Sequence, residues 1–406
     1  MKSLLSERVK GTGKSVIRET LKLTKKPEII SFAGGLPKPE TFPYNSLAEA
    51  SRKQIGENYS RSLQYVITEG VEEFREEVMK WFASFGWKFH LENIIATNSS
   101  QQAIDLVSKA FLDPGDVIFC GAPSYLGALQ NFTLFQANTI GIPVDNDGIN
   151  TTVLEEKVKQ AQLEDKHTKF IYVVPDFQNP TGVTLSGHKR QRLVEIAEKY
   201  NLVVIEDTPY FGLRFAGTEE KPINTYDSHG RVITMSSMSK VLSSGMRLAV
   251  VVGPPKLLEV LVTVKQATDL CTSTTTQWIV TEWLRNHDMA EHLSGVRKHY
   301  KQNRDVMLDS LAKFFPDDEG ISWTKPEGGL FIWVTLPKEI DTEELFHKAI
   351  SENVAYVPGS GFYADDEVHS TMRLCYSLLS TEKIRTGIER LGKVIEKEMA
   401  TVSHKS

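Results

Sequence analysis

Cysteine is scarce in this chain. Its 406 residues include only three cysteines, Cys120, Cys271 and Cys375, which lie far apart and form no CxxC pair. Disulfide frameworks and cysteine metal sites need paired or clustered cysteines, so this spacing argues against both. We therefore expect a reducing compartment and no bound metal.

Long hydrophobic runs are also missing. No apolar stretch approaches the ~20 residues that a helix needs to cross a bilayer. The N-terminal segment carries charges but lacks the apolar core of a secretory signal. We expect a cytoplasmic protein without a membrane partner.

A surplus of positive charge is absent as well, since the net charge is -5 at pH 7. A general nucleic-acid binder needs a broad basic surface to follow phosphates, so no nucleic-acid partner is expected.

The phosphate-binding loop (P-loop) of nucleotide-hydrolysing enzymes is incomplete in this chain. Residues 13–15 resemble its end, but Arg8 stands where its first glycine is required. Any anionic ligand must therefore be held by local groups.

The length and the order of elements point to two domains. A chain of 406 residues exceeds the usual size of a single core. From about residue 70, helical segments alternate with short strand-like runs that are apolar on both faces, as in strands buried between helix layers. This order predicts an α/β domain with a mostly parallel sheet.

After Pro254 the pattern changes to a long, mostly helical region that reaches about Phe315, with Asn286 and Gly295 as weak breaks. Strand-like and helical segments follow and suggest a smaller α+β domain. We expect three parts, an N-terminal segment 1–45, a large domain 46–300 and a small C-terminal domain 301–406.

A lysine follows one of the strand-like runs. The run RVITM leads into the hydroxyls Ser236, Ser237 and Ser239, with Lys240 directly after them and Arg247 seven residues on. Ligands of open α/β sheets bind at the carboxyl ends of strands. A lysine that loses its proton in a cationic neighbourhood can form a Schiff base with an aldehyde, and the other groups can hold a phosphate. A solvated loop lysine would produce the same local pattern.

A carboxylate ends another apolar run. Asp207 closes LVVIED, and Tyr210 lies three residues later. Asp207 could cap a helix or accept loop amides. Alternatively, it could pair with a pyridinium nitrogen and keep that ring able to draw electrons, with Tyr210 bonding the phenolic oxygen of the ring.

Two further segments follow predicted strands. Ser99, Ser100 and Gln101 open a helix, where backbone amides form a natural phosphate site, although an ordinary N-cap has the same composition. Asn179 begins the tetrapeptide Asn-Pro-Thr-Gly, which taken alone could be a simple turn.

In this order, the motifs resemble those of the fold type I pyridoxal-phosphate enzymes of the class I/II aminotransferases. Within this family they resemble the subgroup of 2-aminoadipate, kynurenine and multi-substrate aromatic or branched-chain aminotransferases. The resemblance extends from about Arg18 to the last helix. It rests on SFAGGLPKPETFP, NSSQQAIDLVSKAFLDPGD, APSYLGALQ, PDFQNPTGVTLS, IEDTPY, SMSK, PEGGLFIWVTLP and MRLCYS. It implies a large domain whose mostly parallel sheet lies between helices, and a smaller α+β domain.

The resemblance implies roles around pyridoxal 5'-phosphate. Lys240 would form the Schiff base and act as general acid and base, and Asp207 would pair with the ring nitrogen. Asn179 and Tyr210 would bond the phenolic oxygen. Tyr125 would stack on the ring, although a plain core tyrosine is the alternative.

Other residues would bind phosphate and substrate. The implied phosphate-side residues are Ser99, Ser100, Gln101, Ser237, Ser239 and Arg247. Tyr65 would reach the phosphate of the neighbouring subunit, which implies a homodimer with shared sites. Arg373 would grip the substrate α-carboxylate together with Asn179. Gly35 and Arg18 belong to the N-terminal segment that would close on the substrate, although Arg18 could equally be a solvated helix arginine.

The expected reaction moves the amino group of an L-amino acid of the 2-aminoadipate, aromatic or branched-chain type to a 2-oxo acid. By family analogy the acceptor is 2-oxoglutarate and the kinetics are ping-pong. One alternative is a decarboxylation, elimination or oxidation of an amino acid on the same fold. Another is the ligand-sensing domain of a transcription regulator, against which stands the lack of a helix-turn-helix pattern before Ser31.

Overall fold

The computed structural model describes residues 4–10, 26–365 and 368–403. Within these ranges no helix is both long enough and apolar enough to span a membrane. Arg18 and residues 13–15, on which the sequence raised expectations, lie outside the described ranges.

A large mixed sheet forms the centre of the molecule. Its described strands run in the order β2-β9-β8-β7-β6-β3-β4-β5. Strands β9 and β5 run antiparallel to their neighbours, and the central pairs are parallel. The bounds are β2 Ile94–Thr97, β3 Val117–Ala122, β4 Asn138–Asp145, β5 Gly148–Ile149, β6 Thr168–Val173, β7 Val203–Asp207, β8 Val232–Ser237 and β9 Ala249–Val252. The mostly parallel sheet predicted from the sequence is confirmed.

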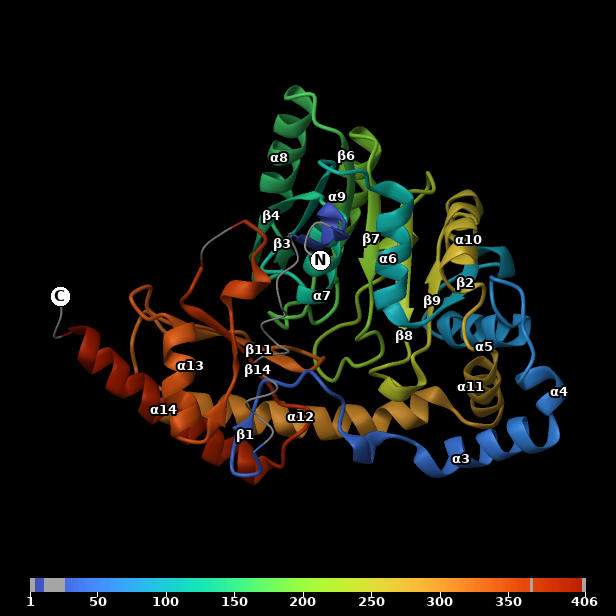
Figure 1. Ribbon diagram of the computed structural model, residues 1–406. Coiled ribbons are helices and arrows are strands. Elements are labelled where there is room, and N and C mark those ends of the chain that lie inside the picture. The colour runs from blue at the N-terminus through green and yellow to red at the C-terminus, as the bar shows by residue number, and fades with distance from the viewer. Residues whose placement is uncertain (1–3, 11–25, 366–367, 404–406) are drawn as a thin grey trace.

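The strands are buried on both faces, which explains their continuous apolar sequence. In β3, Val117 and Phe119 enter one hydrophobic cluster, whereas Ile118 and Cys120 enter the other. Helices α8 (Thr151–Leu163) and α9 (Gly187–Lys199) contribute to the first cluster. Helix α6 (Ser99–Phe111) contributes to the second and crosses in front of the sheet in Figure 1, with α7 (Leu126–Leu134) beside it.

Further helices lie at the β2 end of the large sheet in Figure 1, some beside β2 and others farther out. They are α3 (Tyr44–Arg52), α4 (Tyr59–Ser62), α5 (Glu72–Ala83), α10 (Pro255–Asp269) and α11 (Thr274–Asn286). The other short helices and helical turns that precede α12 in the described sequence are α1 (Glu7–Lys10), η2 (Pro39–Thr41), η3 (Lys53–Glu57), η4 (Leu91–Asn93), η5 (Ile223–Tyr226) and η6 (Ser244–Met246).

A smaller antiparallel sheet lies at the other end of the molecule. Its order is β10-β11-β14-β13, with bounds β10 Ser322–Trp323, β11 Phe331–Thr335, β13 Val357–Pro358 and β14 Thr371–Cys375. Strand β1 (Ile30–Ser31) pairs with β12 (Val354–Ala355), so an N-terminal strand joins this C-terminal part. Helices α13 (Thr342–Ser351) and α14 (Thr381–Ser403) and the turn η7 (Ser360–Phe362) accompany it.

Helix α12 (Met289–Phe314) connects the two parts and runs along one side of the molecule in Figure 1. The expected break at Asn286 coincides with the end of α11. The break expected at Gly295 is wrong, because α12 continues through it. The boundary predicted at residue 300 falls inside this helix, and the division into domains at 45 and 300 stays a prediction.

The sheet topology gathers the sequence motifs at one edge. Parallel strands end at the same edge, and β9 begins there because it runs the opposite way. Ser237 lies opposite Ala249, and Ala249 lies opposite Thr97 on its other side. Asp207 at the end of β7 and Arg247 before β9 therefore emerge at the same edge.

Candidate active site

Asp207 is a buried carboxylate at the end of β7. Tyr172 of β6 donates a hydrogen bond of 2.8 Å to its Oδ2 atom, while Oδ1 has no hydrogen-bond partner among the described residues. Burial raises the pKa of Asp207 to about 6, and the bond from Tyr172 opposes this rise. The carboxylate is therefore mostly ionised at neutral pH. Its free oxygen fits a cationic N–H group such as a protonated pyridine nitrogen.

Lys240 lies just beyond β8 and is largely desolvated. Its Nζ atom donates a hydrogen bond of 2.7 Å to the Gly35 carbonyl. Burial lowers the pKa of Lys240 to about 8, and the positive charges of Arg373 and Arg247 act in the same direction. A substantial neutral fraction at mildly alkaline pH makes the amine a competent nucleophile and base.

Arg247 and a set of serine hydroxyls form a cradle at the start of α6. Arg247 Nη2 donates to Ser99 Oγ at 2.5 Å, and Nη1 lies 3.4 Å from Ser239 Oγ. Ser99 and Arg247 both have positive φ, 65° and 49°. The Ser237 hydroxyl accepts from the Ser239 amide at 3.1 Å. A helix N-terminus beside a guanidinium and several hydroxyls suits a phosphate dianion.

The capping alternative for this segment is not observed. Asn98 occupies the N-cap position of α6 and makes no side-chain capping bond, and the Ser99 hydroxyl contacts Arg247 instead. Ser100 is buried at the next position, near enough to Asp207 to lower its pKa. The hydroxyls at this helix start therefore lie beside Arg247 and Asp207 and do not cap the helix.

Tyr125 lies at the N-cap of α7, close to the same cradle. Its hydroxyl donates to Gln101 Oε1 at 3.3 Å, and the Gln101 amide donates to the Gly127 carbonyl at 3.0 Å. Tyr125 is only partly buried, in contrast to the fully buried Tyr172. Tyr125 also packs against the main hydrophobic cluster, and its role against the cofactor ring stays a prediction.

Arg373 on β14 is a buried cation. Its Nη1 donates to Asn179 Oδ1 at 2.9 Å and its Nη2 to the Ala33 carbonyl at 2.8 Å. The Phe331 and Phe362 rings lie 4.3 and 5.3 Å from its guanidinium carbon. No described Asp or Glu is within ion-pair distance of Arg373, and its Nε atom has no described partner. Since an uncompensated buried charge is costly, this arrangement fits a carboxylate ligand.

The segment that contains Ala33 and Gly35 passes between Lys240 and Arg373. A Cβ atom on Gly35 would lie 2.9 Å from the Phe331 ring, so this position has no room for a side chain. Tyr210 is buried nearby with its ring edge-on to Phe331 at 6.0 Å. Burial raises the pKa of Tyr210 well above its usual value, which keeps its hydroxyl protonated.

Tyr65 is the described candidate that this chain does not bring to the site. It is 80% exposed, in the segment between α4 and α5. Arg18, the other candidate for which no contact is seen, lies outside the described residues. Their roles stay predictions.

Sequence reasoning missed several neighbours of these groups. Tyr172 is one of them, although a hydroxyl-bearing residue in the otherwise fully apolar run FIYVV is itself a signal. The aromatic cover of Arg373, Phe331 and Phe362, and the Ala33 carbonyl had no local signal. They approach Arg373 only through the small sheet and the N-terminal segment.

The groups at this edge fit pyridoxal phosphate in three independent ways. Lys240 can bind an aldehyde, Asp207 offers a free buried oxygen to a ring nitrogen, and the cradle at α6 offers donors to a phosphate. The fold and these groups together define a pyridoxal-phosphate enzyme of fold type I.

Comparison with known proteins identifies the family within this class. The family model described as aminotransferase class I and II matches residues 28–391, and the chain belongs to this family. The chain is 41% identical over 395 residues to aromatic-amino-acid aminotransferase 1 of Thermococcus litoralis, covering 97% of this chain and 94% of that protein. It is 39% identical over 400 residues to the 2-aminoadipate transaminase of Thermus thermophilus, covering 97% of each.

A solved structure extends the comparison to three dimensions. The kynurenine aminotransferase of Pyrococcus horikoshii, in complex with PMP, matches with a TM-score of 0.93 and 41% identity, covering 98% of each chain. The predicted fold, family and cofactor are therefore confirmed. This protein is a pyridoxal-phosphate-dependent aminotransferase, and its substrates are amino acids and oxo acids.

Proposed function

We propose that the enzyme transfers the amino group of an L-amino acid of the 2-aminoadipate, aromatic or branched-chain type to 2-oxoglutarate in a ping-pong cycle. One observation carries the proposal: Lys240 and Arg373 bond to carbonyls of the same short segment. Lys240 donates to the Gly35 carbonyl, and Arg373 donates to the Ala33 carbonyl. An α-carboxylate at Arg373 would bring the α-carbon of the substrate toward Lys240. The relatives named for aromatic amino acids, 2-aminoadipate and kynurenine support this substrate range.

The cofactor site that we propose combines groups from α6, β7, β8 and the loops beside them. When bound, pyridoxal phosphate supplies an aldehyde that condenses with amines and a protonated ring that accepts electrons from the substrate α-carbon. Asp207 would hold the ring nitrogen, with Asn179 and Tyr210 at the phenolic oxygen and Tyr125 against the ring. The phosphate would be held by Ser99, Ser100, Gln101, Ser237, Ser239 and Arg247.

Lys240 is the group that we assign to proton transfer. With its pKa lowered to about 8, it can take the proton from the substrate α-carbon without a large cost of deprotonation. Once protonated, it can deliver that proton to the aldehyde carbon of the cofactor. The Gly35 carbonyl, 2.7 Å from Nζ, orients the amine.

Arg373 and Asn179 would select the carboxylate of the substrate. Because Arg373 is 2% exposed, a carboxylate that binds it exchanges water for a desolvated, charge-assisted pair. Asn179 Oδ1 holds Nη1 at 2.9 Å and so fixes the plane of the guanidinium before substrate arrives.

We further propose a homodimer in the cytoplasm, without nucleic-acid or membrane partners. Residues 44–67 expose large apolar side chains, a pattern that in monomers is rare over a wide area. They are Tyr44, Ile55, Tyr59, Leu63, Tyr65 and Ile67. Burial of this segment against a second copy would let Tyr65 of one subunit reach the phosphate of the other.

Absorbance of the purified enzyme tests the proposed reaction. With a preferred amino donor, the visible band of the cofactor should disappear, and 2-oxoglutarate should restore it with one keto acid formed per donor consumed. A panel of donors ranks the substrates. A band that changes without restoration, or carbon dioxide or ammonia in place of the keto-acid balance, would favour decarboxylation, elimination or oxidation instead.

A further inference from the structure

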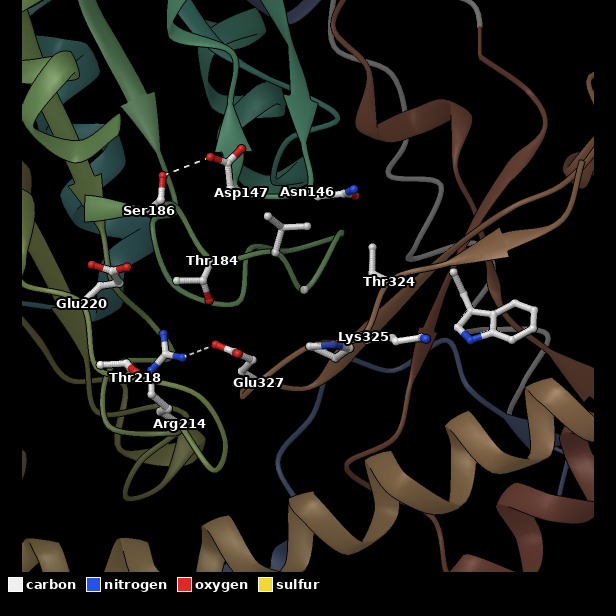
Figure 2. Close-up of a pocket in the computed structure, with 14 residues that line it drawn as sticks. Asn146, Asp147, Thr184, Ser186, Arg214, Thr218, Glu220, Thr324, Lys325 and Glu327 are labelled. Carbon is white, nitrogen blue, oxygen red and sulfur yellow. Dashed lines mark hydrogen bonds and ion pairs between the residues drawn. The ribbon is translucent and has the colours of Figure 1, made fainter. Parts of the chain in front are cut away.

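A buried arginine, Arg214, lies beside the loop that carries Asn179, since it contacts Phe177 in that loop. A cavity of about 470 Å³ opens there, lined in part by Thr184, Ser186, Arg214 and Glu327 (Figure 2). The Arg214 side chain is 8% exposed, and its Nη1 donates to Glu327 Oε2 at 2.6 Å. Figure 2 shows this ion pair joining a loop of the large sheet to the turn before β11.

The backbone on either side of this ion pair forms a small ladder. Arg214 and Gly328 make an antiparallel bridge. The amides of Phe215 and Ala216 both donate to the Glu327 carbonyl, at 2.9 and 3.0 Å. The two segments are therefore held together by main-chain bonds, so the position of Arg214 does not depend on its side chain alone.

One aromatic ring is clamped inside this ladder. The Arg214 guanidinium carbon lies 4.8 Å from the centre of the Phe177 ring. On the glycine side, a Cβ on Gly328 would lie 2.3 Å from the ring, and one on Gly329 would lie 2.5 Å from Phe177 Cβ. Phe177 thus lies between a cation and a stretch of bare backbone, with no space to move toward the turn.

Phe177 opens the loop that carries Asn179, two residues later. Two main-chain hydrogen bonds close this loop. The Gly182 amide donates to the Gln178 carbonyl at 2.6 Å, and the Gln178 amide donates to the Val183 carbonyl at 2.9 Å. Phe177 has a φ of 48°, which is strained for a bulky side chain and persists only when its surroundings hold it. A shift of Phe177 would therefore be passed to Asn179.

We propose that Arg214 is a positioning residue that clamps Phe177 and thereby holds Asn179 against Arg373. The inference rests on the proposed function, because it matters for the reaction only if Asn179 and Arg373 bind substrate and cofactor. Arg214 itself lines the cavity of about 470 Å³ and acts through the loop that carries Phe177 and Asn179.

The chemistry of arginine suits this role better than that of lysine. A planar guanidinium can stack on the Phe177 ring and still donate to Glu327 in its own plane. A lysine ammonium can keep the pair with Glu327 but covers less of the ring. We therefore expect Arg214→Lys to retain part of the function that Arg214→Met loses.

Kinetics of Arg214→Met in the holoenzyme provide the first test. Because a misplacement of about 1 Å can cost up to ~100-fold, we expect kcat/KM to fall by about tenfold, mainly through a higher KM. Arg214→Lys should fall between this variant and the wild type. Arg192→Met removes an exposed arginine that pairs with Glu155 and Glu195, and this control should leave kcat/KM unchanged.

Hydrogen exchange supplies a readout that does not require the loaded enzyme. In cofactor-free protein, Arg214→Met should accelerate exchange of the amides in residues 177–183, while the central strands keep their protection. Unchanged exchange in this loop, or faster exchange throughout the chain, would contradict a local clamp.

A double-mutant cycle with Asn179→Ala decides whether Arg214 acts through Asn179. If it does, Arg214→Met should cost about tenfold in the wild-type background but less than about twofold in Asn179→Ala. Equal costs in both backgrounds would overturn the inference while leaving the proposed function intact. If Asn179→Ala has wild-type kinetics, the assignment of Asn179 under the proposed function fails instead.

Discussion

The two halves of the candidate active site are built in different ways. The half that we assign to the cofactor, with Asp207, Lys240 and Arg247, lies on the edge of the large sheet, where strand register sets the spacing of each group. The half that we assign to the substrate is assembled from segments remote in sequence. Arg373 bonds Asn179 and Ala33, which are 194 and 340 positions away.

Each half also carries a buried charge of opposite sign. Asp207 keeps one oxygen without a described partner, and Arg373 keeps its Nε atom without one. Burial raises the pKa of the first and lowers that of the second, so both charged forms are held at a cost. The comparison suggests that each charge awaits a ligand of opposite sign: a ring cation for Asp207 and a carboxylate for Arg373.

Asp207→Asn should produce the largest effect if the halves are functionally separate. This variant removes the negative charge of the carboxylate beside the ring nitrogen. It should lower kcat by about 10²–10³-fold with little change in KM, since electrostatic stabilisation at the reacting centre is lost. Steady-state kinetics at saturating cofactor measure this split. The matched variant Tyr172→Phe keeps the carboxylate and removes one bond to it, so its kcat should fall far less. A rise in KM as large as the fall in kcat would contradict the functional separation of the two halves.

Arg373→Met should show the opposite split. Truncating one partner of a desolvated charge pair costs about 2–5 kcal/mol, so we expect kcat/KM to fall by at least about 30-fold through a higher KM. The cofactor should remain bound with an unchanged visible band. Loss of the cofactor from this variant would show that Arg373 belongs to the cofactor half.

The pH dependence of cofactor binding sharpens the comparison further. In cofactor-free enzyme, Lys240 with a pKa of about 8 is charged below this pH and neutral above it. The rate of reconstitution should therefore rise with pH through a midpoint near 8, because the neutral amine is the nucleophile. Arg373→Met removes a positive charge that lowers the pKa of Lys240, so the midpoint should move upward. An unmoved midpoint would mean that the two halves are electrostatically independent.

Gly35→Ala should have the smallest effect and tests the segment between the halves. The new methyl would lie 2.9 Å from the Phe331 ring, and relief of such crowding typically costs about 1–3 kcal/mol of stability. Thermal unfolding and KM measure the consequence. Gly34→Ala is the control, because its nearest neighbour would be 3.9 Å away. Equal behaviour of the two variants would contradict a tight fit at Gly35.

The same contrast explains what could be predicted from the sequence. Lys240, Asp207 and the serines each follow an apolar run, so the rule that ligands bind at strand ends placed them at one edge. Arg373 has no such local signal, and by residue pattern alone it would be a charge at the edge of a strand. Its predicted role came only from the family resemblance, because its partners meet through contacts across the chain.

Helix boundaries show a similar limit. Asn286 ends α11, and an Asp288 side chain caps the start of α12 at Ala290 and Glu291. Gly295 carries the same weak signal as Asn286 but lies inside α12, where packing of α12 against the rest of the fold overrides the low helix propensity of glycine. Tyr65 marks a different limit, because the contact predicted for it requires a second subunit.

Borohydride reduction of the holoenzyme, followed by proteolysis and mass spectrometry, tests the central claim most directly. Reduction fixes the bond between the cofactor aldehyde and the amine that holds it, so the modified residue is identified without any kinetic assumption. We predict a single phosphopyridoxyl adduct on the peptide that contains Lys240, and its loss when amino donor is added before reduction. An adduct on a different lysine, or no adduct in protein that carries the visible band, would contradict the account.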